Sequence, residues 1–304
     1  MTTVKKSLYL PFLALAALSI MLTHYFLKNR FNETKAETQE LILATTIYPL
    51  FDMTRSVAGS NAQVINILPP GSSPHLFEFS PSKIKEMQNV KLIFALGHGL
   101  DTWASRISQT IGNIDVVLVD KDVDLRKYPN GAVDPHYWLS MQAAQKMVDN
   151  IAHTLAQRDP EHADGYIENA HLYKIKLEKA QERFVVSLKD VKDAAFLTLH
   201  DAWFYFARDL HLSLAGSFET AGGEEPTIRY LNDLGKKIHD QRIHVIFTEP
   251  QLSLAALKSF AKDHHLTIAE LDPIGGSVGR MTYLDLMEYN VLTLKNTLLN
   301  TKHE

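Results

Sequence analysis

An apolar stripe near the middle of the chain is the feature that most constrains the fold. Apolar residues recur at three- and four-residue steps, at Tyr166, Ala170, Tyr173, Leu177, Ala180, Phe184 and Leu188. This spacing keeps one face of an α-helix apolar for about six turns. A helix of about 30 residues starting near Pro160 would be roughly 45 Å long, more than one lobe requires. The stripe therefore predicts a rigid strut between two lobes, with a long surface helix of a single domain as the alternative.

Short apolar strands alternate with helical patterns on both sides of this stripe. KLIFALG (91–97) and DVVLVD (115–120) precede it, and AAFLTLH (194–200) and HVIFTEP (244–250) follow it. Runs that are apolar throughout are typical of parallel strands covered on both faces. The pattern predicts an α/β fold of two lobes, each with a mainly parallel sheet flanked by helices. We expect an N-terminal lobe at 41–160, a long linking helix at 161–192 and a C-terminal lobe at 193–304.

The first 36 residues form a signal peptide or an N-terminal membrane anchor in this interpretation. Lys5 and Lys6 precede an apolar run from Leu8 to about Leu22, the order found in secretory signals. Ala36 is only a weak cleavage site, and about 20 apolar residues can span a bilayer, so cleavage stays undecided. The chain has no cysteine, which excludes thiolate metal sites and a lipid-modified N-terminal cysteine. We therefore expect a periplasmic or other extracytoplasmic protein that is not a lipoprotein.

The charge distribution argues against nucleic acid as a partner. The net charge is −4, but residues 1–36 hold five Lys or Arg and one Glu. The remaining chain therefore carries 26 basic and 34 acidic residues, a net charge of −8. A body with this balance and no long basic run repels a phosphate backbone.

Three histidines and one aspartate stand where predicted strands end. His75 follows the strand near 62–68, His136 follows the strand at 115–120, His200 ends the strand at 194–200, and Asp272 ends the strand near 267–271. In open α/β sheets, ligands bind beyond the carboxyl ends of the strands. Three imidazoles and one carboxylate can complete a tetrahedral zinc shell, whereas manganese prefers more oxygen ligands. The set predicts a metal site that favours zinc.

Prolines beside these positions strengthen that interpretation. Pro74 and Pro135 precede the first two histidines and Pro273 follows the aspartate, so three of the four loops are conformationally restricted. Taken singly, each residue also has an ordinary interpretation: loop histidines are commonly solvated, and aspartate before proline commonly starts a turn. Only the joint pattern points to a metal.

Four stretches, in this order, resemble the ligand loops of the zinc- and manganese-binding solute receptors of bacterial ATP-binding-cassette (ABC) metal importers: PPGSSPHLFEFSPS (69–82), VDPHYWLS (133–140), LTLHDAWFYFA (197–207) and LDPIGG (271–276). The resemblance covers about residues 41–299. It implies two α/β lobes joined by one long helix, with a metal site in the cleft between them. It also implies His75, His136, His200 and Asp272 as metal ligands. Histidine at the third position, where glutamate accompanies manganese or iron in similar proteins, implies zinc.

The resemblance thus implies an extracytoplasmic binding protein that captures Zn2+ and delivers it to the membrane permease of an ABC importer, without catalysis and as a monomer. One departure is that residues 113–135 contain no histidine, so the histidine-rich loop of many zinc receptors is missing. A receptor for Mn2+ or Fe2+ is the alternative. A secreted zinc hydrolase is a weaker alternative, because its zinc needs an open position for water and the chain has no HExxH motif. The sequence leaves an adhesin role, the affinity and the cognate permease open.

Carboxylates close to these loops are candidate hydrogen-bond acceptors for the predicted histidine ligands. Metal-bound histidines usually donate their second N–H to a carboxylate or a carbonyl. Asp134, Asp201, Glu225 and Glu249 are available for this role by sequence. We also expect His98, in GHGLD, to line the mouth of the cleft.

Overall fold

The structure is a computed structural model that describes residues 19, 21–24, 41–112, 114–219 and 226–301. Residues 41–304 form one compact unit, to which the following description applies. The predicted signal or anchor segment, 1–36, lies outside the described residues except at 19 and 21–24. Within the described part of the chain, no helix is long and apolar enough to cross a membrane.

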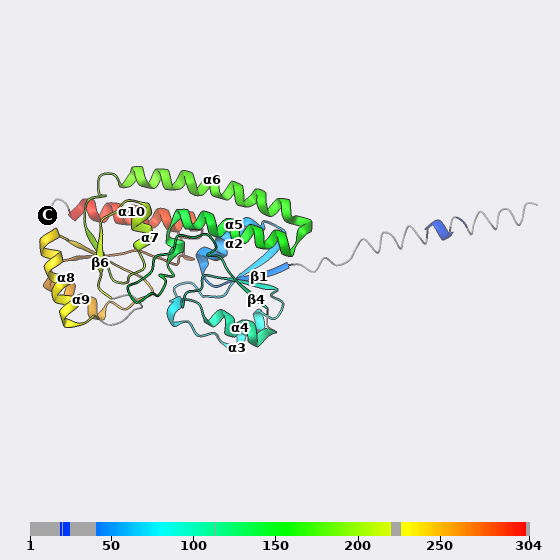
Figure 1. Ribbon diagram of the computed structural model, residues 1–304, viewed down its shortest axis with the longest axis horizontal. Coiled ribbons are helices and arrows are strands. Elements are labelled where there is room, and N and C mark those ends of the chain that lie inside the picture. The colour runs from blue at the N-terminus through cyan, green and yellow to red at the C-terminus, as the bar shows by residue number, and fades with distance from the viewer. Residues whose placement is uncertain (1–18, 20, 25–40, 113, 220–225, 302–304) are drawn as a thin grey trace, which may run out of the picture. The chain divides into compact units, whose positions relative to one another are not determined.

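The N-terminal lobe is built on a parallel four-stranded sheet (Figure 1). Its strands, in the order β2-β1-β3-β4, are β1 (Leu41–Thr45), β2 (Ala62–Asn66), β3 (Leu92–Ala95) and β4 (Asp115–Leu118). Its helices are α2 (Tyr48–Ala58), α3 (Pro81–Glu86) and α4 (Trp103–Ile111). Ser80 caps α3 as an N-cap should, since its Oγ accepts a hydrogen bond from the backbone N–H of Lys83.

The C-terminal lobe repeats this arrangement. Its parallel sheet has the order β6-β5-β7-β8, built from β5 (Phe196–Thr198), β6 (Leu214–Ser217), β7 (Val245–Thr248) and β8 (Thr267–Glu270). Its helices are α7 (Phe204–Asp209), α8 (Ile228–Gln241) and α9 (Ala255–Asp263). In both lobes the second strand therefore lies outside the first, and the third and fourth follow on the other side. The prediction of two parallel α/β lobes is confirmed.

Long helices connect the two sheets. α5 (Met141–Arg158) is followed by a short 3-10 turn (Pro160–His162) and then by α6 (Ala163–Leu188), and α10 (Tyr283–Thr301) closes the chain. The 26 residues of α6 span about 39 Å, and Figure 1 shows this helix running along both lobes. All seven residues of the predicted stripe are buried on it. The long helix is confirmed, while the domain boundaries at 160–161 and 192–193 remain a prediction.

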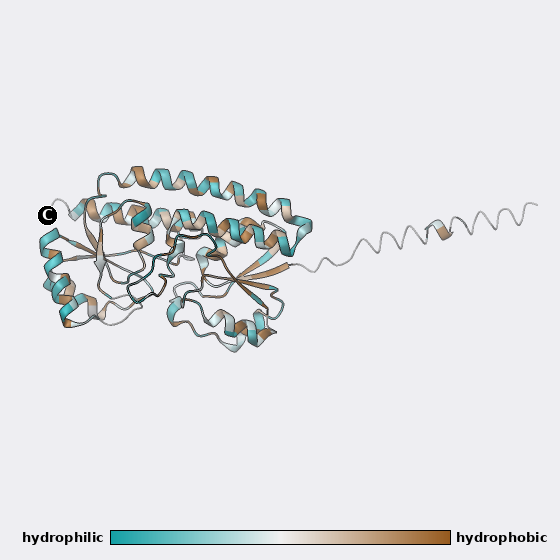
Figure 2. Ribbon diagram, in the orientation of Figure 1, coloured by the Kyte–Doolittle hydropathy of each residue, from teal (hydrophilic) through white to brown (hydrophobic). Residues whose placement is uncertain are grey.

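One apolar core continues from lobe to lobe. Residues of the N-terminal sheet such as Leu43 and Phe94 share a buried cluster with Phe196 and Phe247 of the C-terminal sheet, through α5, α6 and α10. Figure 2 shows the strands of both sheets as mainly hydrophobic and the helices as mixed. A wide opening of the two lobes would expose part of this cluster to water, which is unfavourable. The shared core therefore opposes a wide opening of the two lobes.

A buried carboxylate joins three of the helices that support this core. Asp52 of α2 is 2% exposed. Its Oδ2 accepts hydrogen bonds from the hydroxyl of Tyr173 on α6, at 3.1 Å, and from the backbone N–H of Tyr283 on α10, at 2.9 Å. Its Oδ1 pairs with Arg55 at 2.9 Å, near the surface. Asp52 thus links α2 to the middle of α6 and to the first residue of α10.

We predict that Asp52→Ala lowers the free energy of unfolding by about 3 kcal/mol, because it leaves two buried donors without an acceptor. Urea denaturation followed by circular dichroism measures this loss. The control, Arg55→Ala, removes only the half-exposed partner and should cost less than about 1 kcal/mol. Equal losses in the two variants would contradict a role for Asp52 beyond its surface ion pair.

Candidate metal centre

His75 is presented by a short 3-10 turn, Pro74–Leu76, that follows β2. Pro74 occupies the first position of this turn, where a fixed φ and a missing N–H are tolerated. The carbonyl of Pro74 accepts a hydrogen bond from the indole N–H of Trp103 at 3.1 Å, which anchors the turn to α4. The proline-rich loop is thus fixed by its own ring geometry and by one long-range hydrogen bond.

His136 precedes a second 3-10 turn, Tyr137–Leu139, and is 4% exposed. The carboxylate Oδ1 of Asp134 lies 2.8 Å from His136 Nδ1 and also accepts the backbone N–H of His136 at 3.1 Å. The hydroxyl of Tyr137 donates to the carbonyl of Leu96 at 2.9 Å. These contacts leave Nε2 of His136 free to face the cleft.

His200 lies two residues beyond the end of β5 and is 8% exposed. Its Nδ1 lies 3.3 and 3.4 Å from the two carboxylate oxygens of Glu249, which follows β7. The indole N–H of Trp203 donates to Glu249 Oε1 at 2.9 Å and holds that carboxylate in place. As with His136, a buried carboxylate orients the ring and leaves Nε2 for another partner.

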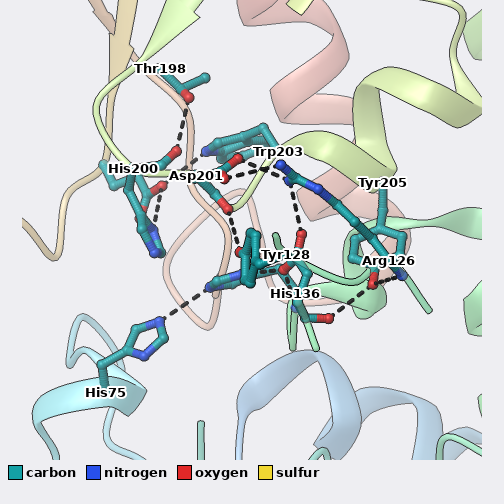
Figure 3. Close-up of polar contacts among 11 residues, drawn as sticks. His75, Arg126, Tyr128, His136, Thr198, His200, Asp201, Trp203 and Tyr205 are labelled. Carbon is teal, nitrogen blue, oxygen red and sulfur yellow. Dashed lines mark hydrogen bonds and ion pairs between the residues drawn. The ribbon is translucent and has the colours of Figure 1, made fainter. Parts of the chain in front are cut away.

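The three histidines meet, although they come from both lobes (Figure 3). The Nε2 atoms of His75 and His136 are 3.2 Å apart, and one nitrogen from each of the three rings lies within 4.8 Å of the others. Two nitrogens bound to one tetrahedral zinc ion are about 3.3 Å apart. The rings also line a cavity of about 20 Å³, a size that suits one ion or water and not an organic ligand.

The charge environment favours neutral rings at two of the three positions. Burial and then the field of the other two imidazoles lower the pKa of His75 to about 3, although its outer edge is exposed. Burial, followed by His200, lowers the pKa of His136 well below its usual value. Burial would also lower the pKa of His200, but the carboxylate of Glu249 outweighs it and the net shift is upward. Neutral imidazole is the form that binds a metal.

Asp272, the fourth predicted ligand, does not join this cluster in the structure. It follows β8 and is 2% exposed, and the next two residues, Pro273 and Ile274, line the cavity with the histidines. Among the described residues, however, the group of ligand atoms within 4.8 Å of one another contains the three histidines and not Asp272. Its carboxylate is engaged by Arg280 and Gln251 instead.

Two of the four predicted supporting carboxylates contact candidate ligand histidines, Asp134 at His136 and Glu249 at His200. Asp201 binds an arginine, and Glu225 lies outside the described residues. His98 pairs with Asp120 at 2.8 Å and lines a separate cavity of about 240 Å³ that also reaches the three histidines. His98 thus lies where the sequence placed it, beside the approach to the cluster.

Arg126, which sequence reasoning missed, joins the loops that carry His136 and His200. Its Nη1 lies 3.2 Å from Asp134 Oδ2 and 3.0 Å from Asp201 Oδ1, and its Nη2 lies 3.2 Å from Asp201 Oδ2 (Figure 3). Asp134 orients His136, and Asp201 follows His200 in the chain. One guanidinium therefore bridges two carboxylates and links the loops that carry two candidate ligands.

The stretch GGSVG at 275–279 matches the letters of the serine-hydrolase pattern GxSxG. In that motif the serine sits on a sharp turn directly between a strand and a helix. Here β8 ends at Glu270 and α10 begins at Tyr283, so Ser277 lies in the middle of a loop. The sequence of this stretch therefore matches the motif, but its structure does not.

Residues 43–297 match the family described as the periplasmic component A of zinc-uptake complexes. The zinc-binding protein AdcA of Streptococcus pyogenes is 27% identical over 285 residues, which are 84% of this chain and 55% of AdcA. The chain thus spans about half the length of this relative. The manganese-binding lipoprotein MntA of Halalkalibacterium halodurans is 26% identical and is matched over 91% of its own length and 87% of this chain.

Among solved structures, FpvC of Pseudomonas aeruginosa, in complex with Mn2+, superposes with a TM-score of 0.76. The match covers 86% of this chain and 99% of FpvC at 24% identity. At that identity the similarity establishes the two-lobed fold, and it leaves the choice of metal open.

The Arg126 contacts lead to a pH-dependent prediction. Burial raises the pKa values of Asp134 and Asp201, while Arg126 opposes this rise. A carboxyl group with a raised folded-state pKa stabilises the fold at low pH, and this contribution is lost as the pH rises through that pKa. Arg126→Ala raises both pKa values further. We therefore expect it to lower the free energy of unfolding by about 2–4 kcal/mol near neutral pH, more at pH 8 than at pH 5.

Urea titrations at the two pH values measure this difference. Arg158 offers a matched control, since it pairs with Asp115 on the surface and both side chains are half exposed. Arg158→Ala should cost less than about 1 kcal/mol, with little dependence on pH. A loss for Arg126→Ala that is equal at both pH values would contradict the account in which one guanidinium lowers the pKa values of both carboxyl groups.

Proposed function

Because this chain belongs to the family of periplasmic zinc-uptake components, we propose that it captures Zn2+ outside the cytoplasm and delivers it to the permease of an ABC importer. The observation that carries the proposal is the meeting of three imidazoles from two lobes around one ion-sized cavity. Metal-binding receptors, and not enzymes, make up this family, as the sequence predicted.

The donor set supports zinc as the cargo. Three imidazole ligands suit zinc, copper, nickel, cobalt and iron better than manganese, which favours oxygen. His75, His136 and His200 are the proposed zinc ligands. Asp272, the fourth residue of the predicted set, can join them only where its carboxylate leaves Arg280, and a water can take its place on zinc. Relatives named for zinc and for manganese match the chain almost equally well. A receptor for Mn2+ or Fe2+ is therefore the alternative that the binding experiment must test.

Transport also requires that the protein releases the bound metal ion. The apolar core shared by the lobes opposes a wide hinge motion. We propose that release depends on small displacements of the four ligand loops, driven by contact with the permease. Three further points belong to the same proposal: an extracytoplasmic location, membrane association through the N-terminal segment if it is uncleaved, and a monomeric state.

We predict that His200→Ala weakens zinc binding at least about 100-fold, because it removes a ligand and not merely a supporting residue, whose loss costs about 10–100-fold. The protein is stripped of metal with a chelator, and Zn2+ and Mn2+ are then titrated in competition with a coloured chelator. His239→Ala is the matched control, since His239 is 90% exposed on α8 and lies outside the cluster.

Wild-type protein should bind one Zn2+ more tightly than Mn2+, and the His239→Ala variant should match it. Wild-type zinc affinity in a folded His200→Ala variant would overturn the assignment of this site. Tighter binding of Mn2+ than of Zn2+ by the wild type would overturn zinc as the cargo and favour the manganese alternative.

A further inference from the structure

Both carboxylate oxygens of Asp272 are already engaged. Oδ2 lies 3.0 Å from Nη1 of Arg280. Oδ1 accepts hydrogen bonds from Gln251 Nε2 at 2.9 Å and from the backbone N–H groups of Ile274 and Gly275 at 3.0 and 3.1 Å. In this arrangement a cation at the three histidines has to compete with these donors for the carboxylate, and above all with the positive charge of Arg280.

The backbone at Asp272 is held as firmly as its side chain. Its N–H donates to Asn290 Oδ1 at 2.8 Å, and its carbonyl accepts from Asn290 Nδ2 at 2.7 Å. Asn290 lies on α10 and is fully buried. The loop therefore cannot simply carry Asp272 toward the histidines. Recruiting the carboxylate as a ligand requires local rotation and the loss of its contact with Arg280.

Arg280 is also fixed in position. Its guanidinium carbon lies 4.5 Å from the ring centroid of Tyr289, and its side chain is 18% exposed. The neighbouring backbone is seated on the other lobe, since the hydroxyl of Tyr48 donates to the carbonyl of Met281 at 3.0 Å. Nη1 of Arg280 forms no hydrogen bond of good geometry, so coulombic attraction holds it to Asp272.

We propose that Arg280 competes with the bound cation for Asp272 and thereby selects Zn2+ against Mn2+. This inference rests on the proposed function and names a determinant of its specificity. Zinc is well bound by three imidazoles and one further small ligand such as water. Manganese favours oxygen ligands and gains more from a carboxylate. Withholding Asp272 therefore penalises manganese more than zinc, because only manganese depends on breaking a nearly buried ion pair.

A neighbouring amide offers a buried hydrogen-bond acceptor beside the histidines. Gln251 lines the cavity beside the histidines, and its Oε1 is buried without a hydrogen-bond partner among the described residues. The amide nitrogen Nε2 of Gln251 donates to the carboxylate of Asp272. The amide oxygen could not take this position, because the carboxylate would repel it. The carbonyl oxygen of this amide can accept a hydrogen bond from a water that completes the zinc shell.

The test is a double-mutant cycle on Zn2+ and Mn2+ affinities of the full chain, with Arg280→Gln, Asp272→Asn and the double variant. Arg280→Gln frees the carboxylate, so it should improve Mn2+ affinity relative to Zn2+ affinity by about tenfold. In the Asp272→Asn background, where no carboxylate remains to be freed, the same substitution should give no such gain. Arg55→Gln removes an arginine from another Arg–Asp pair, far along the chain at α2, and should leave the ratio unchanged.

Three outcomes would overturn the inference. An equal gain in both affinities would mean that Arg280 acts only as a nearby positive charge. A gain that persists in the Asp272→Asn background would mean that it does not act through Asp272. An unchanged ratio in a folded Arg280→Gln variant, with melting temperature and zinc stoichiometry as the checks on folding, would mean that Arg280 does not select the metal.

Arg280→Lys keeps the charge with a shorter reach and provides a second variant if Arg280→Gln does not fold. It should give a smaller shift of the ratio in the same direction, and no shift would count against the inference. Failure of the proposed function is distinguishable, because it would appear as wild-type protein that binds no metal or as an unaffected His200→Ala variant.

Discussion

The close approach of three imidazoles is the interaction on which the rest of the structure depends. Crowding and burial keep two of the rings neutral, and nitrogens of all three come within 4.8 Å of one another. Surrounding side chains hold the rings in this arrangement. Asp134 and Glu249 orient two of the rings, and Arg126 fixes the distance between the loops that carry them.

Rigidity at two levels maintains this approach. The continuous apolar core along α5, α6 and α10 packs the two lobes together and opposes their wide separation. Within the cleft, turns and ion pairs keep each loop in place, including the loop at Asp272, which Arg280 and Asn290 hold from opposite sides. Under the proposed function, adjustment to the cargo would fall to side chains and loops, with exchange of ion-pair partners as the proposed control of affinity.

Much of the fold could be predicted from periodicity alone. The stripe from Tyr166 to Leu188 predicted α6. The apolar runs predicted both parallel sheets, because strands that are buried on both faces consist almost entirely of apolar residues. The histidines at strand ends were also visible, since parallel strands bring their carboxyl ends together. The partners of Arg126 and Arg280 were not visible, because pairing across dozens of residues depends on how loops pack and leaves no local pattern in the sequence.

The central claim is that one cation binds to three imidazoles contributed by both lobes. X-ray absorption at the zinc edge of the loaded wild-type protein tests it most directly, because that spectrum counts the ligands and identifies histidine by multiple scattering from its ring. The account predicts four nitrogen or oxygen ligands at about 2.0–2.2 Å, three of them identified as imidazole by ring scattering. A spectrum with one imidazole or none would show that the zinc ion lies elsewhere and would contradict the account.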